Sequence, residues 1–122
     1  MDKKRILIVD DEIEMAQMLK LRLEANQYEV MIANDGKEGL DKARKEKPDL
    51  LILDLMLPFM DGYKVCGFLK KDSRYAHIPI ILFTARAQDK DKFLGQEAGA
   101  DAYITKPFEP TILLRKITEL LK

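Results

Sequence analysis

Five short apolar runs, separated by longer stretches with a helical pattern, constrain the fold of this 122-residue chain most strongly. Strands that alternate with helices are typical of successive βαβ units, whose strands join in one parallel sheet. The predicted strands are Ile6–Val9, Tyr28–Ala33, Leu50–Leu53, Ile80–Phe83 and Ala102–Thr105. Because a chain of this length fits one domain, we predict a single domain over residues 1–122.

The stretches between the predicted strands contain helix signals of unequal strength. Asp35 followed by Glu38 resembles a capping box and predicts the start of the second helix. Pro110 fits the first turn of the last helix, where its missing N–H group costs nothing. The stretch 87–100 has few apolar anchors and two glycines, which predicts the most loosely held helix. A surface helix with a narrow buried stripe is an equally good interpretation of that stretch.

The composition of the strands predicts their order in the sheet. The first, third and fourth strands are apolar on both faces, as expected for strands covered by helices on both sides. The second contains Glu29 and the fifth is short and mixed, so these two are expected at the edges. This pattern favours a flavodoxin-like α/β sandwich of three layers with strand order 2-1-3-4-5.

Charge and cysteine content exclude several classes of function. Lys+Arg and Asp+Glu both number 21, so no net positive field favours direct binding of nucleic acid. Apolar runs are far shorter than the roughly 20 residues of a membrane span, and the N-terminus lacks a signal-peptide layout. A cytoplasmic domain without membrane contact is therefore predicted. Cys66, the only cysteine, excludes an internal disulfide and is expected to be a buried structural thiol.

Polar residues end four of the five predicted strands, and the carboxyl ends of parallel strands meet at the edge where ligands bind. In strand order they are Asp10 and Asp11, Asp54, Thr84 and Lys106. Three of them have an ordinary explanation when taken alone: Asp11 could cap a helix, Thr84 could be a strand-end hydroxyl, and Lys106 could be solvated. Their joint occurrence at four strand ends favours a functional site.

The three aspartates of this edge predict a metal site. Two like charges about 4 Å apart repel by roughly 4 kcal/mol at an effective dielectric constant near 20, and one lysine cannot neutralise three carboxylates. Asp54 also stands inside a long apolar run, where a buried charge must be paired or bound to metal. Mg²⁺ typically takes one or two carboxylates, several waters and a phosphate oxygen. We therefore predict a Mg²⁺ site that also accepts a phosphate.

With these residues in place, the chain resembles the receiver domains of two-component response regulators, which are CheY-like. Four segments in the family's order carry the resemblance, at residues 6–12, 53–58 together with 60–62, 83–85 and 99–108. The resemblance covers essentially the whole chain. It implies a phosphorelay switch, not an enzyme with a separate substrate, that promotes only its own phosphorylation and slow dephosphorylation.

The resemblance also assigns roles at the acidic edge. Asp54 is implied to be the phosphoacceptor nucleophile, which receives a phosphoryl group from a partner's phosphohistidine. Asp11 and Asp54 are implied to bind Mg²⁺ directly, together with the main-chain carbonyl of Met56. Asp10 is implied to support the metal through water. The donor would be a sensor histidine kinase or a histidine phosphotransfer protein.

The remaining implied roles concern the response to phosphate. Lys106 and Thr84 are implied to contact the phosphoryl oxygens, and the Lys106–Pro107 peptide bond is expected to be cis. Tyr103 matches the family's aromatic switch position, although a plain strand aromatic is the alternative. The face formed by the fourth helix, fifth strand and fifth helix would then contact a downstream output domain or protein. Because the side chain of Met56 has no polar group to orient a water, slow self-dephosphorylation is expected.

Three other functions remain open from the residues. A phosphohydrolase with a nucleophilic aspartate usually has a second acid two residues later, where this chain has Met56. A flavodoxin-like cofactor binder needs a phosphate loop after the first strand, where Asp10, Asp11 and Glu12 would repel phosphate without metal. A docking module without phosphorylation would not need the acidic residues together with Lys106.

Overall fold

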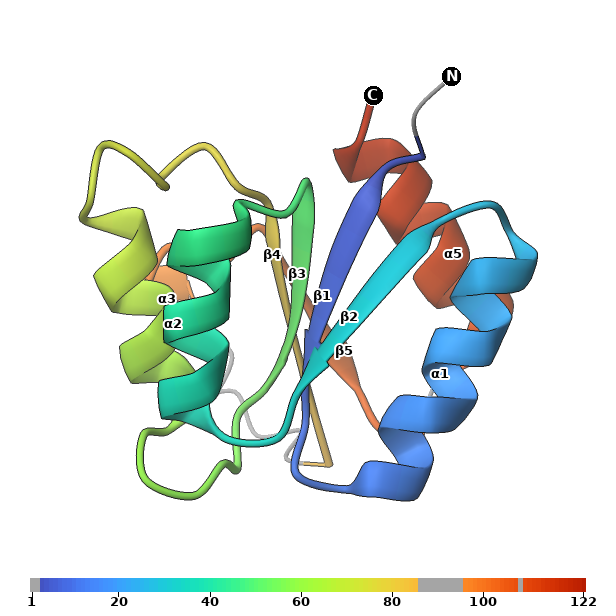
Figure 1. Cartoon of the computed structure of the whole chain (residues 1–122), viewed down its shortest axis with the longest axis horizontal. Helices are drawn as coiled ribbons and strands as arrows, with labels where there is room; N and C mark the ends of the chain where they lie inside the picture. The colour runs from blue at the N-terminus through green and yellow to red at the C-terminus, as the bar shows by residue number, and fades with distance from the viewer. Residues whose placement is uncertain (1–2, 86–95, 108) are drawn as a thin grey trace.

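The computed structural model describes residues 3–85, 96–107 and 109–122 and shows one parallel sheet between two layers of helices (Figure 1). The strands are β1 (Arg5–Val9), β2 (Glu29–Ala33), β3 (Leu50–Asp54), β4 (Ile80–Thr84) and β5 (Ala102–Thr105). All neighbouring pairs are parallel, and the order is β2-β1-β3-β4-β5. The predicted flavodoxin-like order and the two predicted edge strands are confirmed.

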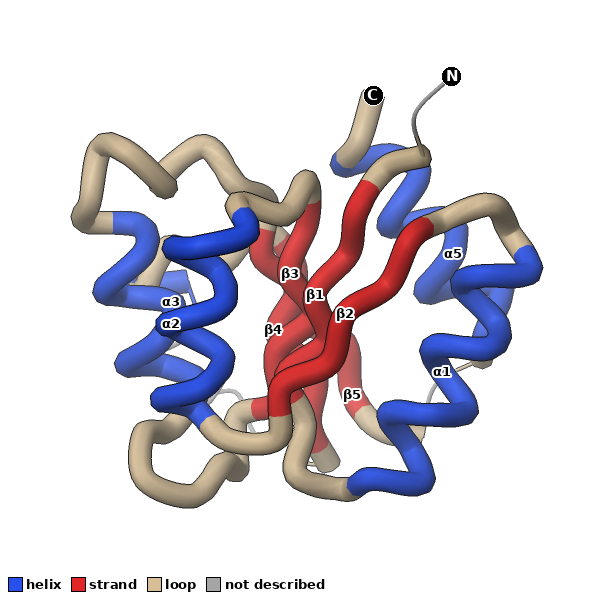
Figure 2. Tube along the Cα trace, in the orientation of Figure 1, coloured by secondary structure: helices blue, strands red, loops and turns tan. Residues whose placement is uncertain are grey.

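The described helices cover both faces of the sheet, as Figures 1 and 2 show. They are α1 (Ile13–Ala25), α2 (Gly36–Glu46), α3 (Gly62–Lys70) and α5 (Pro110–Leu120). The helices α2 and α3 lie on one side, and α1 and α5 lie on the other. Most of the stretch 87–100, for which a loosely held helix is predicted, lies outside the described residues.

Two apolar cores, one on each face, hold these layers together. In β1, Leu7 contributes to the core beneath α2 and α3, whereas Ile6 and Ile8 contribute to the core beneath α1 and α5. Consecutive side chains of a strand point to opposite faces, so a strand covered on both sides must be apolar throughout. This requirement explains the uninterrupted apolar runs of the central strands.

Helix capping fixes the starts of α2 and α3 next to the loops around the sheet's carboxyl edge. The side chain of Asp35 accepts a hydrogen bond from the main-chain N–H of Glu38 at 2.8 Å, as the predicted capping box requires. The Glu38 carboxylate, however, accepts from the N–H of Asn34 at 2.6 Å rather than from that of Asp35. At α3, Asp61 caps the helix by accepting from Lys64 N–H at 3.0 Å.

The start of α2 packs directly against the loop that follows β3. Gly36 donates its N–H to the carbonyl of Pro58 at 3.4 Å, and a Cβ atom on Gly36 would overlap the main-chain carbonyl of Met60. A Cβ atom on Gly62, at the end of the same loop, would likewise come too close to the main-chain carbonyl of Asp54. The loop that leaves Asp54 is therefore held by backbone contacts at both ends.

Cys66 has the environment predicted for a structural thiol. It is fully buried in α3, and its Sγ atom lies 3.4 Å from the carbonyl oxygen of Ala98. Burial raises the pKa of Cys66 to about 12, so the reactive thiolate is scarce at neutral pH. Within the ranges that the structure describes, no helix is long and apolar enough to cross a membrane.

Candidate functional site

Asp10 and Asp54 meet at the carboxyl edge because β1 and β3 are neighbours. Val9 is in register with Leu53, so the next residue of each strand reaches the same edge. Both aspartates are buried, with exposed fractions of 0% for Asp10 and 3% for Asp54. A buried pair of like charges needs a compensating cation.

Lys106 supplies part of that compensation from the end of β5. Its Nζ atom lies 3.1 Å from Oδ2 of Asp54 and 3.4 Å from Oδ2 of Asp10. The ammonium group also lies 4.6 Å from the centre of the Phe83 ring, a cation–π contact, and the main-chain N–H donates to the Thr84 carbonyl at 2.7 Å. The Lys106–Pro107 peptide bond is cis, as the resemblance implied.

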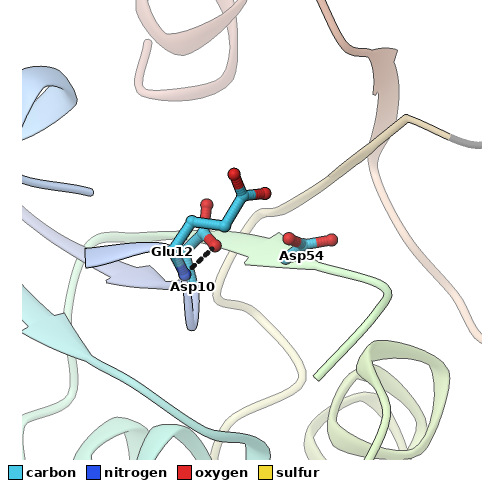
Figure 3. A group of neighbouring side chains, drawn as sticks. All are labelled: Asp10, Glu12 and Asp54. Carbon is cyan, nitrogen blue, oxygen red and sulfur yellow. Dashed lines mark hydrogen bonds between the residues drawn. The ribbon is translucent and has the colours of Figure 1, made fainter. Parts of the chain in front are cut away.

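Glu12 joins this cluster, although the sequence reasoning did not place it among the site residues. A carboxylate oxygen of Glu12 lies 3.1 Å from Nζ of Lys106. Ligand oxygens of Asp10, Glu12 and Asp54 all lie within 4.8 Å of one another (Figure 3). The sequence feature that could have identified Glu12 as a site residue is its position directly after the two aspartates that end the first strand.

Asp11 is not brought into this group of carboxylates. Its side chain is exposed, and the described acidic group that could hold a metal contains Glu12 in its place. Nor is Asp11 the cap of α1, because Glu12 is the N-cap residue and forms no side-chain cap bond. Instead, Oδ1 of Asp10 accepts a hydrogen bond from the main-chain N–H of Glu12 at 2.9 Å.

The charges of the cluster shift the pKa values of Asp10 and Lys106. Burial raises the pKa of Asp10 to about 6, and the charge of Asp54 adds to this, against the lowering effects of the Glu12 N–H group and Lys106. Burial alone would lower the pKa of Lys106, but the charges of Asp54 and Asp10 outweigh it and raise that pKa. Lys106 therefore stays protonated and positively charged, in a site that contains more negative than positive groups.

The other predicted site residues lie in β4, in β5 and in the loop after β3. Met56 donates its main-chain N–H to Oδ1 of Asp54 at 3.1 Å, while its side chain is 57% exposed. Thr84 is buried at the end of β4, in register with Thr105. Tyr103 is partly buried and packs against the core beneath α2 and α3. Most of the stretch 87–100, for which the fourth helix of the output face is predicted, lies outside the described residues.

The chemistry of these donors fits a hard divalent cation. The grouped ligand atoms are carboxylate oxygens, two of them on buried side chains, and only one lysine contacts them among the described residues. Mg²⁺ prefers oxygen ligands and keeps several waters, so an open acidic edge suits it better than a closed cage would. The residues present can therefore hold Mg²⁺ together with an anionic ligand.

Together, the parallel sheet and its acidic edge with a lysine define an α/β domain of the receiver type. The family model for the response regulator receiver domain matches residues 6–118, and the chain belongs to this family. The predicted resemblance is thus confirmed. The chain is a signalling switch domain of two-component systems.

Individual relatives agree with this assignment. The chain is 44% identical over 119 residues to the alkaline phosphatase synthesis transcriptional regulatory protein PhoP of Bacillus subtilis, covering 98% of this chain and 49% of that protein. A CheY-like receiver domain from Methanospirillum hungatei superposes with a TM-score of 0.92 at 39% identity, covering 98% and 94% of the two chains. Chemotaxis protein CheY4 of Vibrio cholerae gives 0.91 at 34% identity, with 98% and 99% coverage. The chain spans about half the length of the curated relatives it matches.

Proposed function

We propose that Asp54 accepts a phosphoryl group from a partner's phosphohistidine with the help of Mg²⁺. The observation that supports this most directly is the buried Asp54 carboxylate, whose two oxygens accept from Met56 N–H and Lys106 at the sheet's carboxyl edge. These contacts fix the orientation of the nucleophile before a donor arrives. Positioning and charge neutralisation are the main contributions that a protein makes to phosphoryl transfer.

In the proposed step, an oxygen of Asp54 forms a bond to phosphorus as the bond between phosphorus and the donor imidazole nitrogen breaks. Asp54 and the carbonyl of Met56 would hold Mg²⁺ directly, with Asp10 acting through water, and the exposed Asp11 would turn toward the ion as the third direct ligand. The bound ion would neutralise charge on the phosphoryl oxygens. Lys106 contributes a fixed positive charge beside Asp54, 3.1 Å from its Oδ2 atom. The Thr84 hydroxyl would donate to another phosphoryl oxygen.

The signal would leave the domain through the two residues that respond to phosphate. Thr84 would move toward the phosphoryl group, and Tyr103, on the neighbouring strand, would change its rotamer at the output face formed by the fourth helix, β5 and α5. Such contacts differ between the two states, as any population shift requires. The donor would be a sensor histidine kinase or a histidine phosphotransfer protein, and the receiver of the signal an output domain or protein.

The relatives indicate one form that the output can take. Several matched proteins are named as transcriptional regulators, and the chain covers about half of each. We propose that a DNA-binding output, where one is attached, lies outside these 122 residues, because the receiver itself has a formal net charge of zero.

Intact-protein mass spectrometry after incubation with Mg²⁺ and acetyl phosphate tests the proposal. The wild-type chain should gain a single phosphoryl adduct that requires Mg²⁺, and Asp54→Ala should abolish it. Asp41→Ala, which removes an exposed aspartate from α2, is the matched control and should keep the adduct. An adduct that persists in Asp54→Ala would refute the assignment, and no wild-type adduct would favour a docking module. Turnover of phosphomonoesters would favour a phosphohydrolase.

The lifetime of the phosphorylated state provides a second test. The side chain of Met56 lies at the rim of the site and has no group that can orient an attacking water. We expect Met56→Asn to speed loss of the adduct by about tenfold, because an amide can position that water. The adduct is followed over time after removal of the donor. A rapid wild-type loss that Met56→Asn leaves unaltered would contradict this expectation.

A further inference from the structure

Glu12 differs from the other two carboxylates of the site in its exposure. Its side chain is 61% exposed, whereas the side chains of Asp10 and Asp54 are 0% and 5% exposed. Asp10 is held by Glu12 N–H, and Asp54 is held by Met56 N–H. Among the described residues, an ion pair with Lys106 holds the Glu12 carboxylate in place. An ion pair with one solvated partner is weak, so Glu12 can leave at low cost.

We propose that Glu12 is a displaceable carboxylate that stays paired with the Lys106 ammonium group until a phosphoryl group reaches Asp54, and that this ion pair slows phosphorylation. This proposal rests on the proposed function, because it requires that phosphate arrives at Asp54. It assigns Glu12 a regulatory role as a positioning residue, in which it acts on the reaction through Lys106.

Three carboxylates of the described residues surround a single cation, Lys106. Nζ of Lys106 lies 3.1 Å from Glu12, 3.1 Å from Asp54 and 3.4 Å from Asp10. A phosphoryl group on Asp54 would bring further anionic oxygens to the same ammonium group. The two aspartates are buried at the strand ends and cannot withdraw, whereas Glu12 can turn toward solvent.

Charge repulsion also distinguishes Glu12 from an ordinary surface acid. Its carboxylate belongs to the group whose ligand oxygens lie within 4.8 Å of one another, so a dianionic donor approaching Asp54 meets its field at short range. Repulsion at such a distance in partly solvated surroundings corresponds to a rate effect of about three- to tenfold. A donor with less negative charge should be repelled less strongly by the Glu12 carboxylate.

The main competing role is that of a metal ligand. If Glu12 bound Mg²⁺ directly, its loss would weaken metal binding and slow phosphorylation. If Glu12 only occupies Lys106, its loss would change Mg²⁺ affinity little and accelerate phosphorylation. The two roles therefore predict opposite signs for the rate.

The experiment compares Glu12→Gln with Glu14→Gln, which removes the same charge from an exposed position in the first turn of α1. Initial rates of adduct formation are measured with acetyl phosphate and with the less anionic phosphoramidate, and Mg²⁺ affinity is measured separately by calorimetry. We expect Glu12→Gln to react about three- to tenfold faster with acetyl phosphate, with a smaller gain for phosphoramidate. Its Mg²⁺ affinity should stay within about threefold of wild type, and Glu14→Gln should match wild type in all three measurements.

Two outcomes would overturn the proposal. Slower phosphorylation together with an affinity for Mg²⁺ lowered by about tenfold or more would make Glu12 a metal ligand. Equal rates for Glu12→Gln and Glu14→Gln would show that the Glu12–Lys106 pair does not affect the reaction. If the wild-type protein itself forms no adduct, the proposed function is rejected instead. This outcome is recognised from the wild type without any variant.

Discussion

Gly36→Ala should lower the free energy of unfolding by about 3 kcal/mol, because no space exists for the added methyl group. A Cβ atom at Gly36 would overlap the main-chain carbonyl of Met60, and backbone cannot move aside as a flexible side chain can. Either α2 or the loop after β3 must shift. Because that loop also holds Met56 at Asp54, adduct formation should slow as well. Chemical denaturation and the rate with acetyl phosphate measure the two effects.

Gly67→Ala is the matched control for this substitution. Gly67 lies in the interior of α3, and a Cβ atom there would have no neighbour within 4 Å. Alanine favours the helix over glycine, so this variant should gain about 0.5–1 kcal/mol of stability. A Gly36→Ala protein as stable as wild type would show that the loop and the helix start can separate freely.

Lys106→Met should destabilise the metal-free protein at neutral pH by about 3 kcal/mol, because two buried carboxylates lose their cation. Methionine keeps an unbranched apolar stem near Phe83 but removes the charge that lies 3.1 Å from Asp54. The same loss should slow adduct formation by about a hundredfold or more. Denaturation in the presence of a chelator measures the stability, and Lys64→Met, at an exposed lysine of α3, is the control.

The pH dependence of this destabilisation has a definite sign. The pKa of Asp10 is about 6 in the folded protein and 3.8 as its ordinary value, so the folded state binds the proton more tightly. This group therefore adds stability as the pH falls from about 6 toward 4, and that stability is lost as the pH rises. Without Lys106 the folded pKa should rise further, so the destabilisation of Lys106→Met should shrink on acidification. A deficit that is constant between pH 7 and pH 4 would contradict this account.

Much of the candidate site could be predicted from the sequence because strand ends are local features. Asp54 interrupts an apolar run, and Lys106 follows the last strand, so a parallel sheet of the predicted order must bring them to one edge. Their 3.1 Å contact agrees with that prediction. The family assignment rests on the same short segments.

The choice between Asp11 and Glu12 could not be predicted in this way. Both are acidic, both follow β1, and both lie in the same connection to α1. Which carboxylate reaches Lys106 depends on the path of that loop, which Asp10 fixes by accepting from the N–H of Glu12. The path of this loop cannot be inferred from a local sequence pattern.

The class of fold, the strand order and the position of the acidic edge follow from the amino-acid sequence alone, because hydrophobic periodicity and strand termini are local properties. The contacts of Glu12 with Lys106 and of Gly36 with Met60 could be found only in the folded protein. These contacts join segments whose relative position is set by the packing of helices and loops on the sheet. Their geometry therefore depends on the whole chain rather than on any one segment.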